Sequence, residues 1–199
     1  MSDTALNKVI QYGTNAERLA FTPDPAAGSQ VLYLWYETDN EPDIYAWNGS
    51  SWEQINSGSA IWARVYHNAN QSISHDTATA LAFNSERADT DTIHDTSTNN
   101  SRLTCKTAGV YTIVGQCGFD ANGTGLRELQ LKLNGSTLIA IKRVPNTGSG
   151  DPAYIDVTTI YSLAVNDYVE MFAKQTSGGS LDVISAGNFS PEFMMRLGS

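Results

Sequence analysis

Four residues close together in the chain, Asp89, Asp91, His94 and Asp95, are of types that bind metals or move protons. They place three carboxylates and one imidazole within a single short segment. Carboxylate oxygens in a loop are ligands that a hard cation such as Ca²⁺ prefers. The spacing is not that of an EF-hand, and a solvated polar loop is the alternative. The segment therefore predicts a candidate calcium site at Asp89, Asp91 and Asp95, and we expect no other cofactor.

The other residues that could do chemistry form no catalytic pattern. His67, His75 and His94 have no partner at the spacing of a metal site or a catalytic triad. The sequence contains neither Gly-x-Ser-x-Gly nor a phosphate-binding Walker motif. Carboxylates brought together across strands could still hydrolyse a glycoside. We therefore predict no catalytic residues and a protein that is not an enzyme, with a polysaccharide-degrading enzyme as the less favoured alternative.

Three predicted loops are rich in glycine, asparagine, serine and threonine: Asp120–Gly125, Pro145–Pro152 and Thr176–Ser180. If they lie at one end of the fold, their amides and hydroxyls could hydrogen-bond a glycan. The candidate ligand-binding residues are Asn122, Thr124, Asn146, Thr147, Ser149 and Ser177. Few aromatic residues are present there to stack on sugar rings, so purely structural turns are the alternative.

Composition and charge exclude several classes of partner. The net charge is −9, and no basic stripe is present to bind phosphates, so we expect no nucleic-acid partner. No apolar run is long enough for a membrane span, and the first residues do not resemble a secretory signal, so we expect synthesis and assembly in a cytoplasm without membrane insertion. Cys105 and Cys117 would lie about 20 Å apart if the segment between them turns back, which is too far for a disulfide.

Alternating polar and apolar residues indicate antiparallel strands through most of the chain. Leu129, Leu131 and Leu133 alternate with Gln130 and Lys132, and turns rich in glycine and asparagine recur at near-regular intervals. Such spacing is typical of an antiparallel jelly-roll β-sandwich, and we predict a mainly β protein. We place this sandwich, called the head, at residues 59–199.

The first part of the chain, residues 1–58, is predicted to be a small β-hairpin module. Asn48 and Gly49 separate two strand-like runs, which is a strong hairpin signal because both residues tolerate positive φ. Three of the four tryptophans of the chain lie here, at Trp35, Trp47 and Trp52. A module this small needs large aromatic side chains to supply its buried area.

An ordered set of short segments makes residues 61–199 resemble a C1q/TNF-like globular head of the kind found in bacteriophage and bacterial proteins. No single segment is specific, and the likeness rests on their order along the chain. The segments are Ala63–Tyr66, Asn70–Ile73, Ala80–Glu86, Asp89–Asp91, His94–Asp95, Arg102–Thr104, Ala108–Tyr111 and Ser190–Phe193.

The first sixty residues resemble a short module of bacteriophage tail and other virion proteins. The matching positions are Gly13–Thr14, Glu17–Arg18, Ala20, Pro25, Gly28, Tyr33–Asp39 and Ile44–Ile55. That module commonly accompanies fibre shafts, but this chain has neither collagen-like Gly-X-Y repeats nor heptads. A long stalk is therefore not expected within it.

The two resemblances together imply a homotrimeric structural protein on the surface of a bacteriophage virion. Tyr161, Tyr168 and Phe172 are the candidates for the three-fold seam, with packing inside one subunit as the alternative. Trp35, Trp47 and Trp52 are the candidates for the particle anchor. The implied role is that of a tail-fibre or spike tip that recognises a host-surface glycan or protein. The alternative is a capsid decoration protein at three-fold positions, and either role makes tail or major capsid proteins its partners.

Overall fold

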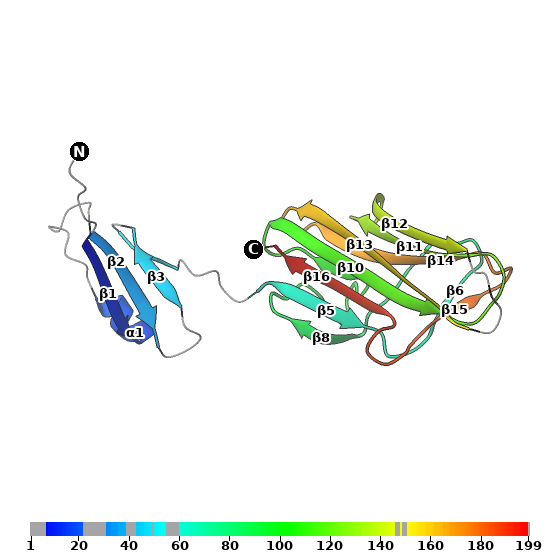
Figure 1. The fold of residues 1–199 in the computed structure, drawn as a ribbon, viewed down its shortest axis with the longest axis horizontal. Helices are drawn as coiled ribbons and strands as arrows, with labels where there is room; N and C mark the ends of the chain where they lie inside the picture. The colour runs from blue at the N-terminus through cyan, green and yellow to red at the C-terminus, as the bar shows by residue number, and fades with distance from the viewer. Residues whose placement is uncertain are drawn as a thin grey trace. The chain divides into compact units, whose positions relative to one another are not determined.

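The computed structural model describes residues 7–21, 31–38, 43–48, 50–54, 60–145, 148 and 151–198. The chain divides into two compact units, Met1–Ser59 and Ala60–Ser199, which are coloured dark to light blue and cyan to red in Figure 1. The first unit is called the N-terminal module below, and the second keeps the name head.

The N-terminal module contains a four-stranded sheet and one short helix. Its elements are β1 (Asn7–Gly13), α1 (Asn15–Ala20), β2 (Val31–Glu37), β3 (Ile44–Trp47) and β4 (Trp52–Gln54). The strand order is β1-β2-β3-β4, with β1 parallel to β2 and the other pairs antiparallel.

The helix α1 begins at a capping box. The side chain of Thr14 accepts the backbone N–H of Glu17, and the Glu17 carboxylate accepts the backbone N–H of Thr14 at 2.8 Å. This reciprocal pair ends β1 and starts the helix. At six residues, α1 is the only helix in the described parts of the chain, where no helix is long and apolar enough to cross a membrane.

The head is a sandwich of two sheets, whose long strands run side by side in Figure 1. Its strands are β5 (Trp62–Tyr66), β6 (Gln71–Ile73), β7 (Thr79–Ala80), β8 (Ser85–Asp89), β9 (Arg102–Thr104), β10 (Gly109–Phe119), β11 (Leu126–Leu133), β12 (Thr137–Pro145), β13 (Ala153–Leu163), β14 (Tyr168–Gln175), β15 (Leu181–Ile184) and β16 (Glu192–Leu197).

Each sheet is built around one central strand with partners on both edges. In the β10 sheet the order is β6-β15-β10-β16-β5-β8. β15 and β16 pair with one edge of β10, and β13 pairs with the opposite edge. In the β11 sheet the order is β12-β11-β14-β7, and β9 also pairs with β14. All these strand pairs are antiparallel, so the mainly β, antiparallel sandwich predicted from the sequence is confirmed.

The core fills the space between the two sheets. Tyr111 and Ile113 of β10 face Leu129 and Leu131 of β11 from the opposite layer, and all four are fully buried. Each such side chain contributes roughly 1.5–3 kcal/mol through its burial. Cys105 and Cys117 lie in the same core as free thiols, and burial raises the pKa of Cys117 above its usual range.

Candidate functional site

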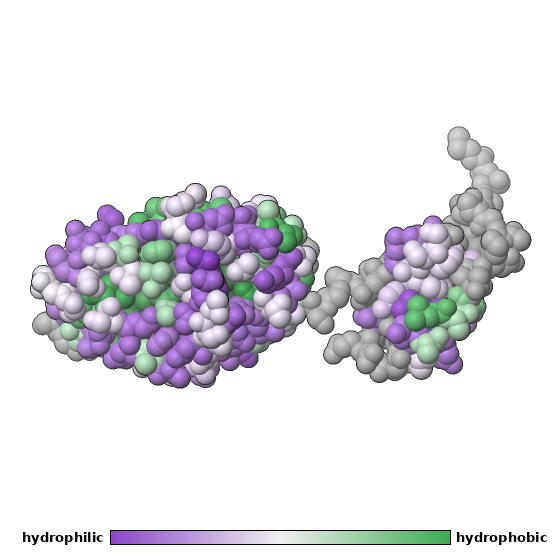
Figure 2. Space-filling view, turned by 180° about the vertical axis from the view of Figure 1, so that it is seen from behind, coloured by the Kyte–Doolittle hydropathy of each residue, from purple (hydrophilic) through white to green (hydrophobic). Residues whose placement is uncertain are grey.

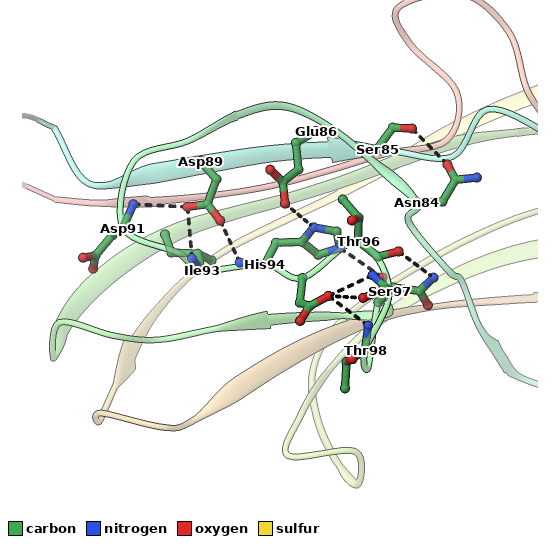
Figure 3. Close-up of polar contacts among 12 residues, drawn as sticks. Asn84, Ser85, Glu86, Asp89, Asp91, Ile93, His94, Thr96, Ser97 and Thr98 are labelled. Atoms are coloured by element: carbon green, nitrogen blue, oxygen red, sulfur yellow. Dashed lines mark hydrogen bonds and ion pairs between the residues drawn. The ribbon is translucent and has the colours of Figure 1, made fainter.

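The segment after β8 is shaped by the carboxylate of Asp89. Its Oδ1 accepts the backbone N–H groups of Asp91 at 3.1 Å and Ile93 at 3.0 Å, and its Oδ2 accepts that of His94 at 2.8 Å (Figure 3). Both oxygens of Asp89 are therefore used to turn the chain out of β8. Such side-chain to backbone bonds are the usual way in which aspartate orders a loop.

The carboxylate of Asp95 closes a second turn a few residues later. Its Oδ1 accepts the backbone N–H groups of Ser97 and Thr98, each at 2.9 Å, and the Ser97 hydroxyl at 2.8 Å (Figure 3). The hydrogen bond from the Thr98 N–H, followed by those from Ser97, lowers the pKa of Asp95 to about 2.

This shift predicts that the Asp95 turn keeps its negative charge well into acid. Because the pKa is lower in the folded state than its ordinary value of 3.8, the turn contributes stability above about pH 4 and loses it as the pH falls toward 2. A carboxyl ¹³C titration by NMR should give a midpoint near 2 for Asp95. The amide signals of Ser97 and Thr98 should shift with the same midpoint. A midpoint near 3.8 would contradict the geometry.

The predicted calcium ligands are not brought together by this loop. Asp91 Oδ2 accepts the Thr107 hydroxyl at 3.2 Å, while Asp89 and Asp95 bond to backbone N–H groups of different turns. In the part of the chain that the structure describes, no group of three or more histidine, cysteine, aspartate or glutamate residues is placed to hold a metal. The three aspartates have a loop-forming role here, and their geometry gives the calcium hypothesis no support.

His94 ties the same loop to the sandwich. Its ring is buried, with Nδ1 2.9 Å from Glu86 Oε1 on β8 and Nε2 3.2 Å from the carbonyl oxygen of Asn100. Both ring nitrogens therefore lie within hydrogen-bond distance of an oxygen acceptor, one on β8 and one within the loop itself. His94 thus holds residues 90–101 next to β8.

A polar cavity of about 430 Å³ opens between this loop and β9. Arg102, Thr104 and Lys106 alternate along the chain, and all three line the cavity, because alternate side chains of an extended segment point to one side. The loop supplies the other lining residues, which are Thr92, Ile93, His94, Asp95, Thr98 and Asn99. Of these lining residues, only His94 and Asp95 were considered as site residues from the sequence. The alternation of polar residues at positions 102, 104 and 106 is the pattern from which the β9 side of the cavity could have been predicted.

The strand ends that bear the predicted glycan-binding loops lie at one end of the head. Leu126 pairs with Pro145 and Arg127 with Gln175, so the start of β11 and the ends of β12 and β14 lie at the same end of the sheet. The Leu126 N–H donates to the Thr176 hydroxyl at 3.0 Å, which joins two of these loops directly. Asn146, Thr147 and Ser149 lie outside the described residues.

A fully buried arginine holds the loop that carries Asn122 and Thr124. The Arg127 guanidinium donates to the carbonyl oxygens of Asn122 at 2.7 Å, Thr124 at 3.0 Å and Leu126 at 3.0 Å. The Asn122 side-chain oxygen accepts the Thr124 N–H at 2.9 Å. Burial lowers the pKa of Arg127, and sequence reasoning missed this residue.

Ser177 also makes bonds within its own turn. Its N–H donates to Gln175 Oε1 at 2.6 Å, and its hydroxyl donates to the Gly179 carbonyl at 3.1 Å. The polar groups of Asn122, Thr124 and Ser177 are therefore partly used in building their turns. This favours the structural reading of these loops over the glycan-binding one.

The three candidate seam residues lie on different surfaces. Tyr168 and Phe172 are on the outward face of the β11 sheet, where Arg102 lies 4.0 Å from the Tyr168 ring and Lys132 lies 4.0 Å from the Phe172 ring. Tyr161, on β13 of the other sheet, is half-buried and packs against the core. The structure thus does not gather them into one patch.

Exposed apolar side chains instead occur on the outward face of the β10 sheet. Val110, Tyr154 and Ile160 are 52%, 53% and 69% exposed and project from the neighbouring strands β10 and β13. Phe189 stacks edge-on against Tyr154 with ring centroids 5.4 Å apart and is 49% exposed. Val110, Tyr154, Ile160 and Phe189 are called the apolar strip below. Figure 2, which shows one face of the head, illustrates how apolar patches interrupt a mainly hydrophilic surface.

The three candidate anchor tryptophans form a single aromatic cluster in the N-terminal module. Trp52 lies 6.2 Å from Trp35 and 5.6 Å from Trp47, and Phe21 packs against both Trp35 and Trp52. Trp35 is only 4% exposed, and its indole N–H donates to the Gly13 carbonyl at 3.3 Å. Trp35 therefore belongs to the core of the module, whereas Trp47 and Trp52 are half-buried and keep some surface.

Comparison with known proteins identifies the fold. No family model and no curated protein matches the chain. Among solved structures, the globular domain of the zebrafish complement 1qA protein is similar, with a TM-score of 0.51 and 17% sequence identity over 70% of this chain and 97% of that chain. At this identity the likeness concerns the fold alone. The head therefore has a jelly-roll fold like that of a C1q globular domain, and this fold agrees with the one that the ordered segments of the sequence predict.

Proposed function

We propose that the protein is a non-enzymatic structural component of a bacteriophage virion, with the head as a homotrimer on the particle surface and the N-terminal module as its anchor. The observation that carries the trimer is the apolar strip. Its members lie on one outward sheet face, Val110 and Ile160 near one end and Tyr154 and Phe189 near the other, and exposed apolar side chains that share a face typically mark an interface. The virion assignment is supported by the sequence resemblance of the first sixty residues.

The role we favour is recognition of a host-surface glycan or protein at the tip of a tail fibre or spike. The head presents a polar cavity of about 430 Å³, which is suited to hydrogen-bonding a hydroxyl-rich ligand. Capsid decoration at three-fold positions is the second candidate. It is favoured by the lack of collagen-like and heptad repeats, since a chain without a shaft suits a protein seated close to its platform.

Substitution of the apolar strip tests the trimer. By light scattering, the wild-type protein should have three times the mass of the 21.6 kDa chain. The Ile160→Lys variant should be monomeric, because trimer formation would bury the charge of the new lysine in the interface. Ile141→Lys is the matched control, because Ile141 is 47% exposed but lies on the β11 sheet. A wild-type monomer at micromolar concentration, or a trimeric Ile160→Lys variant, would refute this seam.

Two further measurements separate the candidate roles. An antibody against the chain should label the virion tail for host recognition and the capsid for decoration. Free protein should block adsorption of the phage only in the first case. Release of oligosaccharides from host polysaccharide by the purified protein would instead show an enzyme and overturn the proposal.

A further inference from the structure

The cavity beside β9 contains two cationic side chains without hydrogen-bond partners. Arg102 forms an ion pair with Glu170, whose Oε1 lies 3.6 Å from Nε, but no residue in the described parts of the chain accepts a hydrogen bond from its guanidinium. That Glu170 oxygen already accepts the Ser101 hydroxyl at 2.6 Å. Lys106 is exposed, and its ammonium makes no ion pair with any described residue.

Arg102 is held in place although its donors are unused. Its guanidinium lies 4.0 Å from the centre of the Tyr168 ring, and its side chain is 34% exposed. Stacking on an aromatic ring fixes the plane of a guanidinium and leaves its edge available to a ligand. A planar guanidinium with a free edge binds a carboxylate through two parallel hydrogen bonds.

The other polar groups of the cavity suit a sugar ring. Thr92, Thr98 and Thr104 supply hydroxyls, and Asn99 supplies an amide that can both donate and accept. The one carboxylate in the lining, Asp95, has its Oδ1 occupied by three donors, so only its second oxygen can accept a ligand hydroxyl. His94 is committed to Glu86 and Asn100 and forms part of the wall.

We propose that this cavity binds an acidic monosaccharide unit, a uronate or sialate within a surface polysaccharide. The sugar carboxylate pairs with Arg102 and Lys106, and the ring hydroxyls bond to the threonines and Asn99. The volume of about 430 Å³ lies within the range of small-molecule sites. The site belongs to the β11-sheet side of the head and does not overlap the apolar strip. The inference rests on the proposed recognition role, because it names the class of ligand.

Phosphate groups of surface polymers are a second source of anionic charge for the same cations. They lack the ring hydroxyls, so the threonines and Asn99 would add nothing to their binding. A comparison of charged and neutral probes therefore separates a sugar site from a general anion site.

The test is an NMR titration of the purified ¹⁵N-labelled full chain with sodium glucuronate, N-acetylneuraminate, glucose and inorganic phosphate. Either acidic sugar should shift amides in residues 92–106, with binding at least tenfold weaker for glucose and for phosphate. Lys106→Gln should weaken acidic-sugar binding about fivefold to tenfold, and Arg102→Gln by more. Lys142→Gln is the matched control, since it removes one exposed positive charge from β12.

Besides a lack of sugar binding, two results would overturn the proposal. One is binding by phosphate as strong as by the sugars, and the other is unchanged sugar binding in both Lys106→Gln and Arg102→Gln. Lys106→Gln keeps the test valid if Arg102→Gln fails to fold. The titration uses the isolated chain, so absence of sugar binding refutes this site and leaves the virion role to the labelling experiment. Conversely, if the protein binds the sugar but the antibody against it labels no particle, only the virion role is refuted.

Discussion

Glu192→Ala is expected to destabilise the head by about 3 kcal/mol, at the lower end of the cost of breaking a buried ion pair. The Glu192 carboxylate is fully buried in β16 and lies 2.7 Å from Arg64 Nε and 2.6 Å from Arg87 Nη2. The two arginine side chains are 34% and 25% exposed, so water can partly replace the lost partner. This limits the loss to the lower end of the range.

The same substitution should loosen the turn before β16. Arg64 also donates to the Asn188 carbonyl at 2.8 Å and Arg87 to the Gly187 carbonyl at 3.1 Å, so Glu192 positions both donors. Urea unfolding measures the stability, and limited proteolysis near residues 185–190 measures the loosening. Asp182→Ala is the control, because this half-buried acid of β15 makes no side-chain bond to a described residue. A loss below about 1 kcal/mol for Glu192→Ala would mean that the arginines are resolvated at little cost.

Gly125→Ala is expected to cost about 3 kcal/mol, from backbone strain and from overpacking. Gly125 has φ +75°, and an added Cβ would lie 2.0 Å from the backbone oxygen of Thr176. A backbone atom cannot move aside as a flexible side chain can. The β11–β14 pair would therefore have to separate at its start.

Thermal or urea unfolding of Gly125→Ala should show this loss, and Gly179→Ala provides the matched control. Gly179 lies in a neighbouring turn, and a Cβ added there would meet no atom within 4 Å, so its replacement should change stability by less than about 0.5 kcal/mol. Equal stability of the two variants would contradict the close approach at Thr176.

The sequence predicted the sandwich well because its information is local. Leu129 and Leu131 face the core as their alternation with polar residues indicates, and a jelly roll follows from many such strands. The parallel pairing of β1 with β2 was not foreseen, since it joins segments separated by α1 and by residues 21–30. Pairing across a crossover leaves no local signature comparable to the hairpin signal of Asn48–Gly49.

The candidate site was predicted less well for a physical reason. Closeness in sequence suggested that Asp89, Asp91 and Asp95 share a ligand, yet their oxygens bond to backbone and hydroxyl donors of separate turns. The orientation of Arg102 depends on Tyr168, which comes from a strand far along the chain. Such long-range contacts cannot be read from spacing alone.

The partners of surface aromatic residues likewise could not be predicted from the sequence. Alternation correctly puts Tyr168 and Phe172 on one face of β14, but it does not tell which partner covers them. Each is covered by a cation from a neighbouring strand of the same sheet. The apolar strip, by contrast, combines residues from two long strands and a turn, and only the register of β10 with β13 shows that they share one sheet face.

The position of β16 between β10 and β5 has a consequence for biosynthesis. The ribosome makes β16 after every other strand of the head, yet it fills the middle of the sheet. Until Leu197 has left the ribosome, β10 and β5 expose facing edges that can pair with other chains. The head therefore cannot complete its β10 sheet before β16 is available, and truncation before β16 should yield aggregates rather than a smaller folded domain.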